Sequence, residues 1–206
     1  MTGAILLAGG RGSRMGGVTK PLLTVGESTL LERAVHAVSG CEPITIVGPE
    51  MATIGAVSWV REEPPFGGPV AAIAAALESW RADGHASRTD PVWTAVVACD
   101  LPGVEEAVEH IESAIAAQPT DVDGVCLVDG RDRAQWLLGA YRTEALRSVI
   151  EELPAAGQGC SMRSVVESLR VILVHAPESM TFDIDTWDDL AHARDMINHN
   201  HPRGRA

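Results

Sequence analysis

The chain has 206 residues, of which 46% are hydrophobic and 21% charged, a balance typical of a globular domain and unlike that of a disordered segment. Its formal net charge of −12 argues against nucleic acid and anionic membranes as partners, unless cations are concentrated at one place. No apolar run reaches the length of a membrane span, no signal-peptide pattern opens the sequence and no two of the four cysteines form a CxxC pair. We therefore expect a cytoplasmic protein with reduced, mostly buried cysteines.

Short apolar stretches alternate with helical patterns along the chain. Strands are predicted at residues 4–7, 44–47, 56–60, 92–98, 124–128, 135–141 and 171–174. Helices are predicted after Ser28 as N-cap, at residues 70–80, 104–117, 143–153 and 161–169, and after Thr186, with Asp189 completing a capping-box pattern. The alternation predicts an α/β fold, a single-domain Rossmann-like three-layer sandwich with a mostly parallel sheet. Residues 1–198 are expected to form the domain and residues 199–206 a polar tail.

Three polar features are expected to follow strand ends. They are the loop from Ala8 to Lys20, Asp100, and the pair Asp183 and Asp185, which an extended backbone would point to the same side. Ligands of open α/β sheets bind beyond the carboxyl ends of the strands. We therefore expect these features to meet in one site.

The loop from Ala8 to Lys20 is rich in glycine and in cations. Its glycines allow backbone N–H groups to form an anion-binding nest, and Arg11, Arg14 and the chain's only lysine, Lys20, add charges that could neutralise a triphosphate. The alternative is a solvated basic surface loop. A P-loop pattern is absent, and the dinucleotide pattern fails because Met15 stands where the third glycine belongs, which disfavours a nicotinamide oxidoreductase.

This loop resembles the signature of the molybdenum cofactor guanylyltransferases, which reads LAGG, three residues, RMGG, then a lysine and paired leucines. The resemblance implies a nucleotidyltransferase fold and a Mg²⁺-dependent transfer of GMP from GTP to molybdopterin, with release of pyrophosphate. The Gly9-Gly10 pair follows the guanine version, whereas related cytidylyltransferases read LAAG. Thr19 departs from the aspartate that the family commonly has before the lysine. The nucleotide-binding residues implied in this loop are Leu7, Ala8, Gly9, Gly10, Arg11, Gly12, Ser13 and Lys20.

A second segment is similar to the family's acidic pair and GPLAG turn. It comprises Glu62-Glu63 and the residues that begin at Gly68-Pro69. The resemblance implies that Glu63 accepts hydrogen bonds from guanine and that Gly68 lies near the nucleotide. The alternative for Glu63 is a solvated position at a strand end.

The sequence Cys99-Asp100-Leu101-Pro102 is similar to the family's CDTP or CDLP element, and Asp100 ends an apolar strand. A carboxylate in this position suits Mg²⁺, which prefers one or two carboxylates with phosphate oxygens and water. Asp100 is the expected principal metal ligand, which does not exclude a helix-capping role. Asp183 is expected to be a second metal ligand or to contact the acceptor phosphate, and Asp185 either joins it or braces the final helix.

The resulting hypothesis assigns catalytic roles to Arg14, Lys20 and Asp100 and metal binding to Asp100 and Asp183. The implied partners are GTP, molybdopterin or molybdenum cofactor, and molybdoenzymes or chaperones that accept the product; nucleic acid and membranes are not expected. Two alternatives stay open, a molybdopterin cytidylyltransferase and a non-catalytic partner that binds GTP or the cofactor. The segment Gln135-Trp136-Leu137-Leu138 matches one that in relatives lies near the acceptor, but Trp136 and Tyr141 are expected to be core residues.

Overall fold

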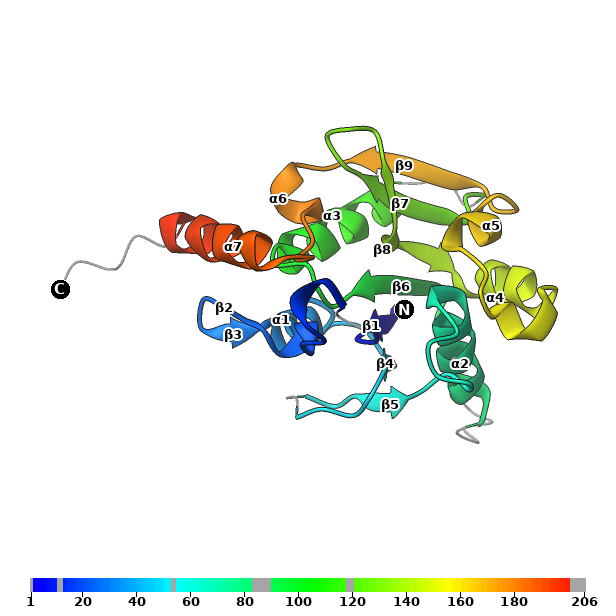
Figure 1. The fold of residues 1–206 in the computed structure, drawn as a ribbon. Helices are drawn as coiled ribbons and strands as arrows, with labels where there is room; N and C mark the ends of the chain where they lie inside the picture. The colour runs from blue at the N-terminus through cyan, green and yellow to red at the C-terminus, as the bar shows by residue number, and fades with distance from the viewer. Residues whose placement is uncertain (1, 11–12, 53–54, 83–89, 118–120, 201–206) are drawn as a thin grey trace.

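The computed structural model describes residues 2–10, 13–52, 55–82, 90–117 and 121–200. A seven-stranded sheet in the order β5-β4-β1-β6-β8-β7-β9 forms its centre (Figure 1). Every neighbouring pair is parallel except those made by β8, which runs antiparallel to both β6 and β7. The expectation of a single Rossmann-like domain with a mostly parallel sheet is confirmed. The strands are β1 (Thr2–Leu7), β4 (Ile44–Val47), β5 (Ser58–Val60), β6 (Trp93–Ala98), β7 (Gly124–Val128), β8 (Ala134–Arg142) and β9 (Val171–His175).

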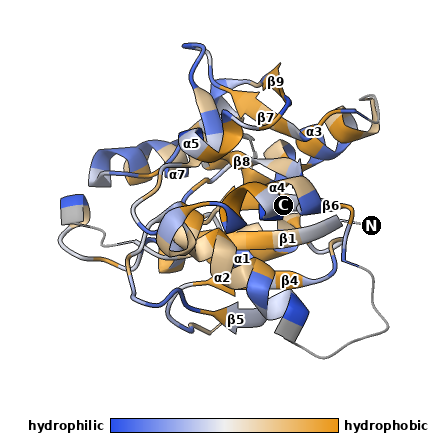
Figure 2. Cartoon of the chain, turned by 90° about the vertical axis from the view of Figure 1, so that its right-hand side faces the viewer, coloured by the Kyte–Doolittle hydropathy of each residue, from blue (hydrophilic) through white to orange (hydrophobic). Residues whose placement is uncertain are grey.

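Helices cover both faces of the sheet (Figure 1). One face packs against α1 (Leu30–Ala37) and α3 (Val104–Ala116), the other against α2 (Pro69–Ala82), α4 (Thr143–Glu151) and α5 (Met162–Val166). Strand β1 shows how the layers form, because Ala4 and Leu6 enter the first core and Ile5 the second. The central strands are accordingly largely apolar (Figure 2). Tyr141 is fully buried and Trp136 packs against the second core, so the prediction that both are core residues is confirmed.

A third apolar cluster joins segments from opposite ends of the sequence. Helix α7 (Trp187–Asn200) packs on the small hairpin formed by β2 (Thr24–Val25) and β3 (Ser28–Thr29). The buried members of this cluster are Met15, Val25, Leu30, Ile184, Leu190 and Ala193. Since Met15 lies in the first loop and Ile184 in the segment before α7, burial of these side chains fixes both segments at the same edge of the sheet.

Several local predictions differ from the structure. Asp183 and Asp185 do not follow a strand end, contrary to what the sequence had suggested. Helix α6 (Glu178–Thr181) comes before them, and the residues 182–185 have no regular secondary structure. Helix α7 continues through Asn200, so residues 199–200 of the expected tail are helical, and residues 201–206 lie outside the described residues. Within the described part of the chain, no helix is both long and apolar enough to cross a bilayer.

The N-cap of α1 is Thr29, so the prediction of Ser28 was wrong by one residue. The Thr29 hydroxyl accepts from the backbone N–H of Glu32 at 3.1 Å, and the Glu32 carboxylate accepts from the backbone N–H of Thr29 at 2.8 Å. Ser28 instead pairs in β3 with Val25. The predicted capping box of α7 is confirmed, with Thr186 and Asp189 bonded reciprocally.

The α1 cap yields a stability prediction. Thr29→Ala removes the acceptor for the first-turn N–H and should destabilise the fold by about 1 kcal/mol. Thermal unfolding followed by circular dichroism should show a midpoint lower by about 2–4 °C. Ser28→Ala is the matched control and should leave the midpoint unchanged; equal losses in both variants would contradict the assignment of the cap.

Candidate active site

A cavity of about 410 Å³ lies at the carboxyl ends of β1, β4, β5 and β6. Its volume is within the range of about 300–1,000 Å³ typical of small-molecule sites. The lining comes from residues 7–10, Arg14 and residues 17–21 after β1, Gly48 and Pro49 after β4, Arg61, Glu62 and Phe66 after β5, Asp100 after β6, and Asp185 before α7. The structure thus brings together the three features that the sequence places at expected strand ends, and Arg14 and Asp185, which are 171 residues apart, contact each other.

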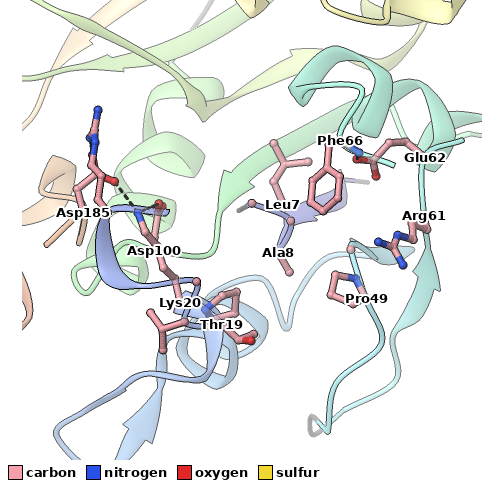
Figure 3. A pocket seen from close by; sticks show the side chains of 17 residues that line it. Leu7, Ala8, Thr19, Lys20, Pro49, Arg61, Glu62, Phe66, Asp100 and Asp185 are labelled. Atoms are coloured by element: carbon pink, nitrogen blue, oxygen red, sulfur yellow. Dashed lines mark hydrogen bonds and ion pairs between the residues drawn. The ribbon is translucent and has the colours of Figure 1, made fainter. Parts of the chain in front are cut away.

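The cavity has two chemically different sides (Figure 3). On one side Lys20, Asp100 and Asp185 form a charged group. On the other side the nonpolar surfaces of Ala8 and Phe66 lie beside Glu62 and Arg61, among other lining residues. This division suits a ligand with a charged part and a flat, less polar part.

Lys20 is the centre of the charged side. It opens a short 3-10 helix, Lys20–Leu22, in which Pro21 is buried, and only 18% of its side chain is exposed. Its ammonium donates to Asp185 Oδ1 at 2.5 Å and lies 3.7 Å from Asp100 Oδ2. Arg14, 72% exposed, donates to the other oxygen of Asp185. The Asp185 carboxylate therefore pairs with both cations, and Lys20 also lies near Asp100.

The pKa values of the two carboxylates are shifted in opposite directions. Burial raises the pKa of Asp100 to about 6, an effect that Lys20 opposes and that the negative charges of Asp183 and Asp185 increase. The hydrogen bond from Lys20, together with the charges of Lys20 and Arg14, lowers the pKa of Asp185 against the effect of its own burial. The ionised form of Asp185 is thus already stabilised by its neighbours, whereas that of Asp100 would be stabilised by additional positive charge nearby.

Three carboxylates are placed so that they could share a metal ion. One oxygen each from Asp100, Asp183 and Asp185 lies within 4.8 Å of the others. Such an all-oxygen set fits a hard divalent cation. The C-terminal members are fixed by the backbone, because Ile184 N donates to the Asp100 carbonyl at 3.0 Å and Asp185 N donates to Asp189 at 3.0 Å. Asp185 N therefore contacts the final helix, while its side chain faces the cations.

Only some of the residues of the first loop that are expected to contact the nucleotide are found in the cavity lining. Leu7, Ala8, Gly9 and Gly10 line the cavity. Ser13 begins a 3-10 helix, Ser13–Met15, and Arg11 and Gly12 lie outside the described residues.

In the second segment, Glu62 lines the cavity and Glu63 does not. Glu63 is exposed, and its carbonyl accepts from Gln158 at 3.2 Å. Gly68, also outside the cavity lining, precedes α2 and its carbonyl accepts from Ala72 N at 3.1 Å. The orientation of the loop therefore selects Glu62 of the acidic pair.

Sequence reasoning did not identify several residues of the cavity. Gly48 and Pro49 directly follow a predicted strand, so the strand-end rule could have found them. Arg61 also directly follows a predicted strand, so the same rule applies to it. Phe66 carries no such signal, because only the path of the loop after β5 turns it toward the cavity.

Comparison with known proteins places the fold and site in a wider context. The family described as "MobA-like NTP transferase domain" matches residues 4–173. The molybdenum cofactor guanylyltransferase of Bordetella petrii is 30% identical over 158 residues, covering 71% of this chain and 74% of that protein. The enzyme of the same name from Methylibium petroleiphilum is 27% identical over 202 residues, covering 90% and 92%.

Solved structures share the fold. Molybdopterin-guanine dinucleotide biosynthesis protein A from Archaeoglobus fulgidus superimposes with a TM-score of 0.67 at 22% identity, covering 97% of this chain and 100% of that one. The 2-C-methyl-D-erythritol 4-phosphate cytidylyltransferase from Thermus thermophilus gives 0.63 at 18% identity, covering 94% and 98%.

The raised pKa of Asp100 predicts an effect on stability. The folded, metal-free protein binds this proton more tightly than the unfolded chain, whose carboxyl has an ordinary pKa near 3.8. The destabilisation by ionised Asp100 is therefore absent below pH 4, develops between pH 4 and 6, and is complete above about pH 6. In EDTA at pH 8, Asp100→Asn should unfold at least about 2 °C above wild type, and the difference should vanish near pH 4. A lower midpoint for the variant at pH 8 would contradict this account of the site.

Proposed function

We propose that this chain, which belongs to the MobA-like NTP transferase family and is a nucleotidyltransferase, transfers GMP from GTP to molybdopterin or the molybdenum cofactor and releases pyrophosphate. The proposal places this activity in the cytoplasm and requires Mg²⁺. The observation that carries it is the position of Lys20 Nζ, 3.7 Å from Asp100 and 2.5 Å from Asp185 in a cavity open to a triphosphate. The guanylyltransferase names of the relatives support the choice of GTP and acceptor.

The triphosphate is proposed to lie across the loop after β1. Leu7 and Ala8 with the following residues Gly9, Gly10, Arg11, Gly12 and Ser13 would bind the nucleotide through backbone groups, and Arg14 and Lys20 would bind phosphate oxygens. On arrival of the phosphates, both cations would exchange Asp185 for phosphate. The base would lie against the loop after β5. There the resemblance proposes Glu63 as the partner of guanine and Gly68 as a nearby contact, whereas the carboxylate of the acidic pair that lines the cavity is Glu62.

The proposed metal site consists of Asp100 and Asp183, and the three-carboxylate cluster supports it. Mg²⁺ bound there would supply positive charge to the phosphates. The same charge would stabilise the ionised form of Asp100, which burial and the neighbouring carboxylates disfavour. Asp183 is exposed and close to Asp100. Its other proposed role, contact with the acceptor phosphate, would require a cation between the two anions.

The chemical step needs positioning more than proton transfer. An oxygen of the acceptor's terminal phosphate attacks the α-phosphorus of GTP in line, a new P–O bond forms, and the bond to the pyrophosphate oxygen breaks. The attacking oxygen is already an anion, so no general base is needed. Arg14 and Lys20 neutralise the charge that develops on the transferred and leaving groups. The product would then pass to a molybdoenzyme or a chaperone.

A pyrophosphate-release assay tests the proposal. With Mg²⁺ and molybdopterin, GTP should support release, whereas CTP, ATP and UTP should not, and EDTA should abolish it. Release with CTP alone would indicate a cytidylyltransferase, and GTP binding without any release would indicate a non-catalytic partner. Either result would contradict guanylyl transfer by this chain.

Two cation variants test the charged side of the cavity. Lys20→Ala and Arg14→Ala should each lower the rate by about 10²-fold or more, because each removes a charge that stabilises the transition state. Arg14 is 72% exposed, so its removal should leave folding intact even if the Lys20 variant is destabilised. Arg163→Ala on α5, which removes another exposed arginine paired to one carboxylate, is the control and should retain full activity. Wild-type rates in the folded Lys20 variant would remove the centre of the mechanism.

A further inference from the structure

The less polar side of the cavity contains an exposed aromatic ring. Phe66, one of the two phenylalanines of the chain, is 55% exposed, although large apolar side chains are usually buried. It contributes to the cavity lining. Figure 3 shows the ring extending into the space between Leu7 and Ala8 on one side and Arg61 and Pro49 on the other. A large apolar surface exposed within a cavity indicates a contact with a ligand better than it indicates a core residue.

The backbone holds this ring in an uncommon conformation. Phe66 has a φ of +66°, a left-handed conformation that bulky residues rarely adopt and that costs about 1–3 kcal/mol. Its N–H donates to Glu62 Oε1 at 2.9 Å, so a carboxylate of the cavity wall fixes the turn. Strain of this kind persists where the surrounding structure over-determines it, and it is concentrated at functional sites.

A second loop supports the turn from outside the cavity. Gly159 N donates to the Gly67 carbonyl at 2.8 Å, and Gln158 Nε2 donates to the Glu63 carbonyl at 3.2 Å. This support is itself packed closely on α2, because a Cβ at Gly157 would lie 2.4 Å from Val70 Cγ1. The backbone that carries Phe66 is therefore held by contacts on both sides of its loop.

Besides Leu7 and Pro49, the cavity wall near the ring includes backbone and small side chains. Gly48 has a φ of +152°, and a Cβ there would lie 3.1 Å from both Ala8 C and Gly9 N. The ends of β1 and β4 can therefore approach each other closely, with Ala8 and Gly9 presenting little side-chain bulk. This part of the wall therefore contributes little side-chain bulk to the cavity that Phe66 also lines.

We infer that Phe66 stacks on the nucleobase of the bound triphosphate and is a binding residue of this site. The inference rests on the proposed function, because it requires a nucleoside triphosphate whose phosphates occupy the side of the cavity with Lys20. An aromatic side chain can stack on any of the bases, so Phe66 would contribute affinity and not selectivity. Selectivity for guanine would come from polar groups near the base, such as the carboxylates of the loop after β5.

Calorimetric titration of nucleotide with Mg²⁺ tests this role. Phe66→Gly removes the ring and suits a left-handed backbone, so the turn should persist. It should raise the Kd for GTP about tenfold. Phe66→Tyr keeps the ring and should bind within about twofold of wild type. Leu173→Ala, which truncates another exposed apolar side chain on β9, is the control and should bind as wild type does.

Inorganic tripolyphosphate with Mg²⁺ separates stacking from damage to the site. This ligand has no base, so the glycine variant and wild type should bind it equally. Unchanged GTP binding in the glycine variant, or an equal loss for GTP and tripolyphosphate, would overturn the inference. If the wild-type protein binds another triphosphate more tightly than GTP, the proposed preference for GTP is wrong, but the stacking inference is not. A tenfold higher Kd of the glycine variant for that other triphosphate would still support stacking on Phe66.

Discussion

The site depends on one ammonium group held between two carboxylates. Lys20 neutralises Asp185 directly and lies near Asp100, which carries the unfavourable free energy of a partly desolvated charge. Without this cation the acidic residues of the site would repel one another, in a chain whose net charge is already −12. The apolar cluster formed by Met15, Ile184 and their neighbours positions these groups, because it buries the first loop against the C-terminal segment.

This arrangement explains how the cavity suits phosphoryl chemistry. The pairing with Asp185 holds both cations beside the cavity, and phosphate would replace that carboxylate as their partner. Asp100 and Asp185 have the same chemical group but opposite pKa shifts, so one is suited to an added divalent ion and the other to holding the arginine and lysine. The opposite side of the cavity, with Phe66 and Ala8, provides a less polar environment for a base.

The sequence predicted the architecture and the meeting of distant segments because both follow from general rules. Apolar strands that alternate with helices form a parallel sheet, and the carboxyl ends of its strands share one edge, so Asp100 and Lys20 come together. These rules do not decide between two neighbouring residues that could both play the same role. Thr29 and Ser28 are both good N-caps, and only the hairpin pairing of Ser28 decides between them. Similarly, the path of one loop determines that Glu62, and not Glu63, faces the cavity, and that a phenylalanine joins it.

A crystal structure with Mg²⁺ and a non-hydrolysable GTP analogue tests the central claim most directly. The account predicts a metal ion coordinated by Asp100, with Lys20 and Arg14 moved from Asp185 onto the phosphates. A triphosphate bound away from the loop after β1, or a metal ion that does not touch Asp100, would contradict it.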